Sequence, residues 1–151
     1  MMANVKQQIE ACGYTYNPPP DVVPNSLKAL ELTELARSVG LHKEVHDRLM
    51  HAYWSEAANI AELDTLLELC AEAGLDRTEA AEALAEKRFR ETVYAATREA
   101  NKVGINAIPA FVLDKRLLLV GAYPHDMFEK AFEQLAEAEA KAETEAETES
   151  P

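Results

Sequence analysis

The sequence is poor in cysteine, and its two cysteines are not close neighbours. The 151 residues contain Cys12 and Cys70 and no Cys-x-x-Cys pair. A disulfide framework needs several cysteines and an oxidising compartment, so none is expected here. Cys70 stands in the apolar segment 66–71 and is expected to be a buried, inert thiol. Cys12 precedes Gly13 at the end of a short helical segment and is expected to be exposed.

Long apolar runs and an excess of basic residues are also lacking. No run approaches the about 20 apolar residues that cross a membrane, and residues 1–10 have no apolar core of the signal-peptide kind. The 15 Lys and Arg face 27 Asp and Glu, which gives a formal net charge of −12. Such a surface repels phosphate backbones. We therefore expect a cytoplasmic protein that binds neither nucleic acid nor a membrane.

Motifs for cofactors, metals and nucleophiles are absent as well. The sequence has no glycine-rich phosphate loop and no nucleophile elbow, so no cofactor and no catalytic residue are predicted. His42 and His46 are spaced to share one face of a helix, as metal ligands do. The residue after His42 is Lys43, not the Glu of zinc proteases, and no third ligand shares that face. We interpret both histidines as solvated surface residues and predict no metal site.

Hydrophobic residues make up 48% of the chain, enough for the core of one domain. Their spacing is helical over most of the first hundred residues, and Asn25, Ser26 and Asp76 stand where helix N-caps are expected. A connector with four prolines, residues 14–24, separates the first helix from the rest. The predicted helices cover residues 4–11, 26–39, 43–57, 61–73, 77–85 and 89–103.

Two adjacent aromatic residues, Tyr53 and Trp54, lie near the end of one predicted helix. Such a ring pair could line a pocket, but on an amphipathic helix it is more often part of the core. We therefore predict that both rings belong to the buried face, together with Val45, Leu49 and Ala52.

The pattern changes after residue 104. Residues 110–113 and 117–120 are short apolar runs separated by Asp114, Lys115 and Arg116, which predicts a β-hairpin. Because the runs are almost continuously apolar, both faces of the hairpin are expected to be covered by helices. Pro124 opens a last helix. Residues 136–151 contain six Glu and one Lys and are expected to be a helix extension or a solvated, solubilising tail.

Pro109 stands directly before the first predicted strand, where proline removes a ladder donor. From the local sequence alone a trans bond is expected, since cis X-Pro bonds are rare in folded proteins. A cis bond would leave the backbone groups of Ile108 free to pair with an extended peptide. The local sequence leaves both readings open.

Five stretches of the chain match one known family in order and spacing. They are residues 24–26, 51–60, 69–76, 103–112 and 119–124, the last two being VGINAIPAFV and LVGAYP. Together they resemble the DsbA-like thioredoxin-fold family, in particular its FrnE-like branch, and they are also similar to 2-hydroxychromene-2-carboxylate isomerases, which bind glutathione. The resemblance covers roughly residues 3–135. It implies a cis Pro109, with Ala107, Ile108 and Pro109 as substrate-binding residues.

The resemblance also implies a fold: a mostly helical α/β chain, a truncated thioredoxin-like (DsbA-like) fold with a helical insertion, a β-hairpin and a C-terminal helix. The domain would cover residues 1–135, with the helical insertion at 26–103 and the cis-proline strand, second strand and last helix at 104–135. Residues 136–151 would be an acidic tail.

The sequence departs from the family in one respect that determines the function we expect. Relatives begin with a strand, a helix that opens with Cys-x-x-Cys, and a second strand, and this sequence has no counterpart. Since a low-pKa thiolate makes disulfide exchange fast, we expect an oxidoreductase-family protein that is redox-inactive alone. Whether the chain is an enzyme stays open. The truncation would also expose an apolar edge of the sheet, to be covered by self-association or by a missing N-terminal piece.

Two alternatives remain beside this reading. The chain could be a module that binds an extended peptide, a glutathione-like thiol or a small molecule. It could instead be an interaction protein that dimerises through the apolar edge.

Overall fold

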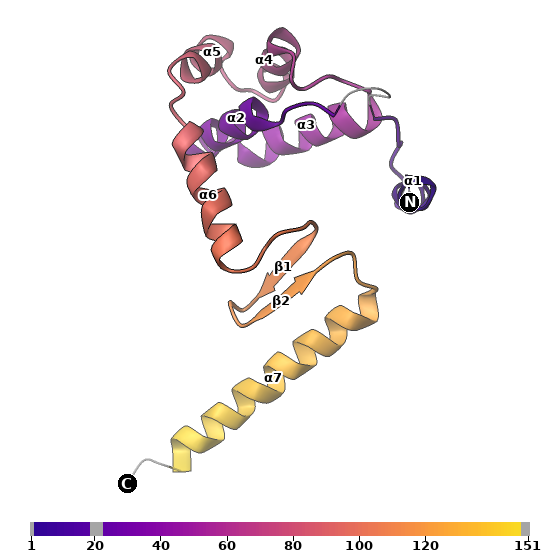
Figure 1. Ribbon diagram of the computed structural model, residues 1–151, viewed down its shortest axis with the longest axis vertical. Coiled ribbons are helices and arrows are strands. Elements are labelled where there is room, and N and C mark those ends of the chain that lie inside the picture. Colours follow the sequence, from indigo (N-terminus) through magenta and orange to yellow (C-terminus); the bar gives the residue numbers. More distant parts are fainter. Residues whose placement is uncertain (1, 19–22, 149–151) are drawn as a thin grey trace. The chain divides into compact units, whose positions relative to one another are not determined.

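Helices precede and follow one short hairpin in the computed structural model, which describes residues 2–18 and 23–148 (Figure 1). The elements are α1 (Met2–Ala11), α2 (Leu27–Ser38), α3 (His42–Ser55), α4 (Leu63–Glu72), α5 (Arg77–Ala85), α6 (Arg90–Lys102), β1 (Ala110–Leu113), β2 (Leu117–Val120) and α7 (His125–Thr148). The chain divides into two compact units, residues 1–97 and residues 98–151. Each of the described helices is too short or too polar to cross a membrane. The predicted mostly helical α/β fold is confirmed.

The helix boundaries follow the signals in the sequence. The side chain of Asp76 accepts a hydrogen bond from the amide of Glu79 at 2.8 Å and so caps α5. At α2 the side chain of Ser26 makes no capping bond, and Asn25 Oδ1 accepts from the amide of Leu27 at 2.9 Å instead. The helix predicted from residue 61 begins at Leu63, because Asn59 Oδ1 holds the amide of Ala61 in a preceding turn. The connector prolines at 19 and 20 lie outside the described residues.

The core of the first unit lies among α2, α3, α4 and α5. Its fully buried apolar side chains include Leu32, Val45, Leu66 and Cys70. A fully buried leucine contributes about 1.5–3 kcal/mol relative to an exposed one, so this layer carries much of the unit's stability. The prediction that Tyr53 and Trp54 belong to the buried face is wrong: both are only partly buried. They lie near the end of α3, where Ala52 is still fully buried but the two larger rings reach the surface.

A buried ion pair joins α2 to the beginning of α6. Glu31 is only 2% exposed, and its Oε1 accepts a hydrogen bond from Arg90 Nε at 3.0 Å. The other oxygen, Oε2, is buried and has no hydrogen-bond partner among the described residues. A buried carboxylate with one unsatisfied oxygen depends strongly on its remaining partner. The Arg90 side chain therefore pairs with the Glu31 carboxylate and fixes the beginning of α6 against α2.

The second unit is a hairpin beside a long helix. β1 and β2 pair antiparallel, with Ala110 opposite Val120 and Leu113 opposite Leu117. The turn contains Asp114 and Lys115, both with positive φ, and the amide of Arg116 donates to the carbonyl of Leu113 at 3.0 Å. On one face Phe111 meets Phe128 of α7 edge to face, with ring centroids 4.8 Å apart. The predicted hairpin is confirmed.

Helices cover less of the hairpin than the sequence predicts. Within residues 98–141, Ala131 is the one buried hydrophobic side chain, and Val112 on the strand remains 51% exposed. The interpretation that helices cover both faces is therefore only partly right. α7 runs without a break past residue 136, so the acidic segment begins as a helix extension, while residues 149–151 lie outside the described part.

Replacing Arg90 by methionine should destabilise the chain by leaving Glu31 buried without its ion-pair partner. We expect the free energy of unfolding to fall by about 2–3 kcal/mol, less than for a wholly buried pair because Arg90 is partly exposed. Urea denaturation followed by circular dichroism measures the change.

Arg77→Met is the matched control, since Arg77 pairs with Asp64 at the exposed surface. Its expected cost is below about 1 kcal/mol. The double variant Glu31→Leu/Arg90→Met should recover most of the loss, and equal midpoints for Arg90→Met and Arg77→Met would contradict this role of the pair.

Candidate functional site

The loop between α6 and β1 contains the three residues that the family resemblance assigns to substrate binding. Ala107, Ile108 and Pro109 are all exposed, and the Ile108 side chain is 91% exposed. The Ile108–Pro109 peptide bond is cis. This confirms the expectation drawn from the resemblance and corrects the one drawn from the local sequence. The substrate-binding role itself stays a prediction.

Hydrogen bonds fix this loop at its two ends and leave its middle free. The amide of Ile105 donates to the carbonyl of Ala100 at 2.9 Å, and the carbonyl of Pro109 accepts from the amide of Gly121 at 2.8 Å. Between these points, the backbone groups of Ala107 and Ile108 have no hydrogen-bond partner within the described residues. Exposed backbone donors and acceptors held between two fixed points are suited to pairing with an extended ligand.

The outer edge of β1 continues this row of free groups. In an antiparallel ladder, alternate residues direct their amide and carbonyl toward the partner strand. Because Pro109 is bonded to Gly121, residues 109, 111 and 113 face β2, and the backbone groups of Ala110 and Val112 face away. The free backbone groups of Ala110 and Val112 could not be predicted from their side chains. Only the register of the hairpin identifies them.

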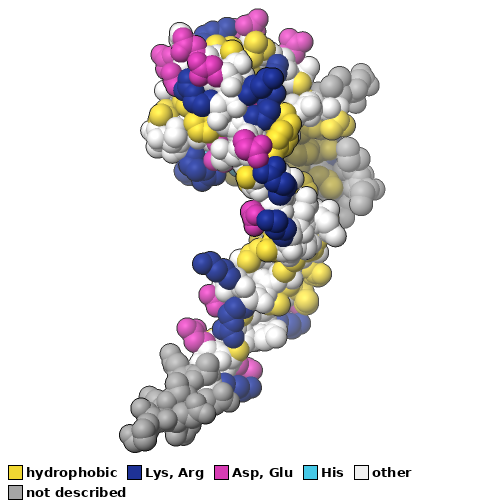
Figure 2. Space-filling model, turned by 60° about the vertical axis from the view of Figure 1, so that its left-hand side comes forward, with side chains coloured by type: hydrophobic (Ala, Val, Ile, Leu, Met, Phe, Trp, Pro, Cys, Tyr) yellow, Lys and Arg dark blue, Asp and Glu magenta, His cyan; other side chains and the backbone are white. Residues whose placement is uncertain are grey.

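Apolar side chains surround the loop and the strand edge within the second unit. Hydrophobic side chains reach the surface at the height of the hairpin in Figure 2. Those with at least a third of their surface exposed include Ile108, Phe111, Val112, Tyr123, Met127 and Phe132. The exposed apolar edge expected from the sequence is therefore present. Large exposed apolar patches mark sites of association or ligand binding.

Cys70 lacks the properties of a redox thiol, whereas Cys12 is a free thiol at the surface. Cys70 is fully buried, and burial raises the pKa of its thiol to about 12. At neutral pH almost none of it is the thiolate that attacks disulfides. Cys12 is exposed and forms no disulfide. Both expectations about these two cysteines are confirmed.

Two of the histidines on α3, His42 and His46, contact each other and neighbouring charged side chains. The rings of His42 and His46 stack with centroids 5.9 Å apart. An Arg37 guanidinium nitrogen lies 2.8 Å from His42 Nε2, and Asp47 Oδ1 lies 3.6 Å from His46 Nδ1. No group of three potential metal ligands occurs among the residues that the structure describes.

The burial of Cys70 predicts that only one of the two thiols reacts in the folded chain. At pH 8, excess iodoacetamide should alkylate Cys12 within minutes and leave Cys70 unmodified, because burial keeps Cys70 protonated and inaccessible. Mass spectrometry of the native and urea-unfolded protein counts the modified thiols.

Cys12→Ser is the control for this labelling, and it should show no rapid modification until the chain unfolds. Two equally fast modifications in the native parent would contradict the assigned burial of Cys70.

Comparisons with known proteins agree with this fold. A family model described as a DSBA-like thioredoxin domain matches residues 1–133. The uncharacterized protein YwbO of Bacillus subtilis (strain 168) is 30% identical over 115 residues, which cover 74% of this chain and 57% of YwbO. The crystal structure of a probable DsbA oxidoreductase from Streptomyces coelicolor is similar with a TM-score of 0.79 and 29% identity, covering 87% of this chain and 57% of that one. The chain thus spans little more than half the length of these relatives, and it belongs to the DsbA-like thioredoxin-domain family.

Proposed function

We propose that this chain is the substrate-binding part of a DsbA-like thiol–disulfide oxidoreductase of the FrnE-like branch. Its ligand is an extended peptide or a thiol such as glutathione, held at Ala107, Ile108 and Pro109. The observation that carries the proposal is the unpaired backbone of Ala107 and Ile108 beside the free edge of β1. Family membership and the similarity to a probable DsbA oxidoreductase support it.

In this proposal, disulfide exchange needs reactive thiols supplied by another segment or chain. In that reaction a thiolate attacks one sulfur of a substrate disulfide, forms a mixed disulfide and expels the other sulfur as a thiolate. A second thiol then attacks the mixed disulfide, which leaves the enzyme oxidised and the substrate reduced. This needs two accessible thiols in close proximity, and Cys70 is fully buried in the helical core while Cys12 lies at the surface. Alone, the chain would bind the substrate without exchanging its disulfide.

The thiol-bearing segment is also the proposed partner of the free strand edge. The outward backbone groups of Ala110 and Val112 and the apolar surface around them suit an added strand. A second copy of this chain is the other candidate for that edge. The cytoplasm is the proposed compartment, since reduced cysteines such as Cys12 and Cys70 persist there.

Binding at the loop can be tested with ¹⁵N-labelled protein and a short S-methylated cysteine peptide, which cannot undergo exchange. Amide shifts are expected at Ala107, Ile108, Ala110 and Val112, where backbone groups are free. Ile108→Ala should weaken binding about three- to tenfold by removing exposed apolar contact.

Val23→Ala is the matched control, because Val23 is similarly exposed but lies in the connector. It should bind like the parent. Shifts spread evenly over the chain, or equal affinities for the two variants, would contradict a site at Ile108.

The isolated chain should also fail to reduce insulin disulfides with dithiothreitol above the uncatalysed rate, because no pair of adjacent thiols is present. Turbidity at 650 nm follows the reaction. Catalysis that persists in the parent and disappears in Cys12→Ser would show that Cys12 is a redox thiol and that the proposed division of roles is wrong.

A further inference from the structure

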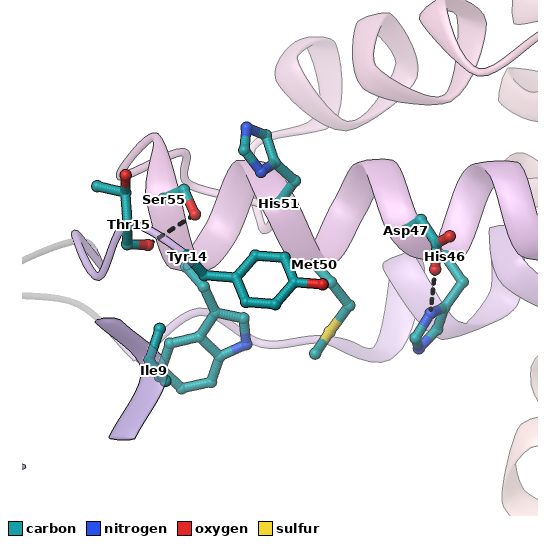
Figure 3. Close-up of a pocket in the computed structure, with 9 residues that line it drawn as sticks. Ile9, Tyr14, Thr15, His46, Asp47, Met50, His51 and Ser55 are labelled. Carbon is teal, nitrogen blue, oxygen red and sulfur yellow. Dashed lines mark hydrogen bonds and ion pairs between the residues drawn. The ribbon is translucent and has the colours of Figure 1, made fainter. Parts of the chain in front are cut away.

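The first unit contains a cavity that the proposed substrate site does not use. It lies between α1, the connector that follows it and α3, and has a volume of about 590 Å³. Figure 3 shows Ile9 of α1, Tyr14 of the connector and Met50 of α3 around it. Small-molecule sites in proteins typically measure roughly 300–1,000 Å³, so the volume suits one ligand of modest size.

The indole of Trp54 forms a wall that other aromatic rings hold in place. Tyr53 meets it edge to face with centroids 4.7 Å apart and an interplanar angle of 75°. Tyr16 stacks on it at 6.1 Å and 26°. A side chain restrained from two directions loses little further freedom when a ligand contacts it. This wall is therefore formed before any ligand arrives.

Two hydrogen bonds join the connector to the end of α3 and hold the cavity open. The amide of Asn17 donates to the carbonyl of Trp54 at 2.6 Å, and Ser55 Oγ donates to the carbonyl of Thr15 at 2.7 Å (Figure 3). Both bonds join the connector to α3, so Tyr14 of the connector stays opposite α3. The site does not depend on a separate closing movement.

The lining selects for an apolar, aromatic ligand. Ile9, Tyr14, Met50 and Trp54 supply hydrocarbon, ring and thioether surface, and methionine adapts to flat rings. His46, His51 and Thr15 add groups that can make a hydrogen bond to a ligand. A ring with one polar substituent would satisfy both parts of this lining.

The charges around the cavity disfavour a charged ligand. Asp47 lines the cavity, and its hydrogen bond with Lys43 holds the pKa of its carboxyl below the usual value, so it stays ionised. Glu56, beside His51, is paired with Arg48. The carboxylates of Asp47 and Glu56 would repel an anion. Both carboxylates already pair with basic side chains, so they are not available to a cation. An uncharged ligand avoids both costs.

We propose that this cavity binds an uncharged aromatic small molecule with one or two rings and a hydroxyl or N–H group, of the phenol or indole class. The site lies wholly within the first unit. It is independent of the loop at Ile108, so either site can fail while the other stands.

The chain reports on this site directly, because Trp54 is its single tryptophan. In ¹H–¹⁵N spectra the one indole N–H resonance should shift saturably when p-cresol or indole is added. Cyclohexanol, benzoate and benzylamine serve as the non-aromatic, anionic and cationic probes, and each should bind at least fivefold more weakly than p-cresol. Absence of a saturable shift with p-cresol and indole, or tighter binding of benzoate or benzylamine, would overturn the proposal.

Variants locate the binding. Met50→Glu places a charge in the cavity at a half-exposed helix position and should weaken p-cresol binding at least tenfold. Leu30→Glu is the matched control, because Leu30 is a similarly half-exposed helix residue on α2 that does not line the cavity, and it should bind like the parent. Tyr14→Ala, in the exposed connector, is a second variant and should weaken binding several-fold without affecting the core. Equal binding by the parent and both cavity variants, or loss only in Leu30→Glu, would place the ligand elsewhere and overturn the proposal.

Discussion

One hydrogen bond, from the amide of Gly121 to the carbonyl of Pro109, sets the phase of the hairpin. Because pairing in an antiparallel ladder alternates, this bond decides which strand residues are satisfied by β2 and which present free groups outward. It also anchors the chain immediately after the exposed Ile108. The candidate binding surface is therefore a consequence of register more than of any reactive side chain.

The two units differ in how completely they bury their apolar residues. The helical unit has a closed core around Leu32 and Leu66, and a buried ion pair fixes its connection to α6. The hairpin and α7 bury little, with Ala131 the one buried hydrophobic side chain in residues 98–141. A part of a protein that buries so little gains most from contact with another segment or chain. The surface proposed for binding and the least buried part of the chain therefore coincide.

More of the fold than of the candidate site could be predicted from the sequence. Apolar periodicity and the glycine stops placed the helices of both units, since amphipathic helices are determined locally. The cis bond before Pro109 followed from family resemblance alone, because the local sequence favours trans. The partial exposure of Trp54 was not predicted, because helical periodicity assigns a residue to a face of the helix but does not determine how deeply its side chain is buried. The burial of Glu31 depends on Arg90, which is far away in the sequence, and no local sequence pattern predicts such a pair.

The packing of Cys70 has a consequence for a member of a thiol-exchange family. Any accessible thiol in such a protein can be captured by its own disulfide substrates, as a dead-end adduct that stops turnover. Enclosed by the leucines of the helical core, Cys70 is chemically insulated from that side reaction. It functions there as a small hydrophobic residue, and of the two thiols only the exposed Cys12 stays open to such an adduct.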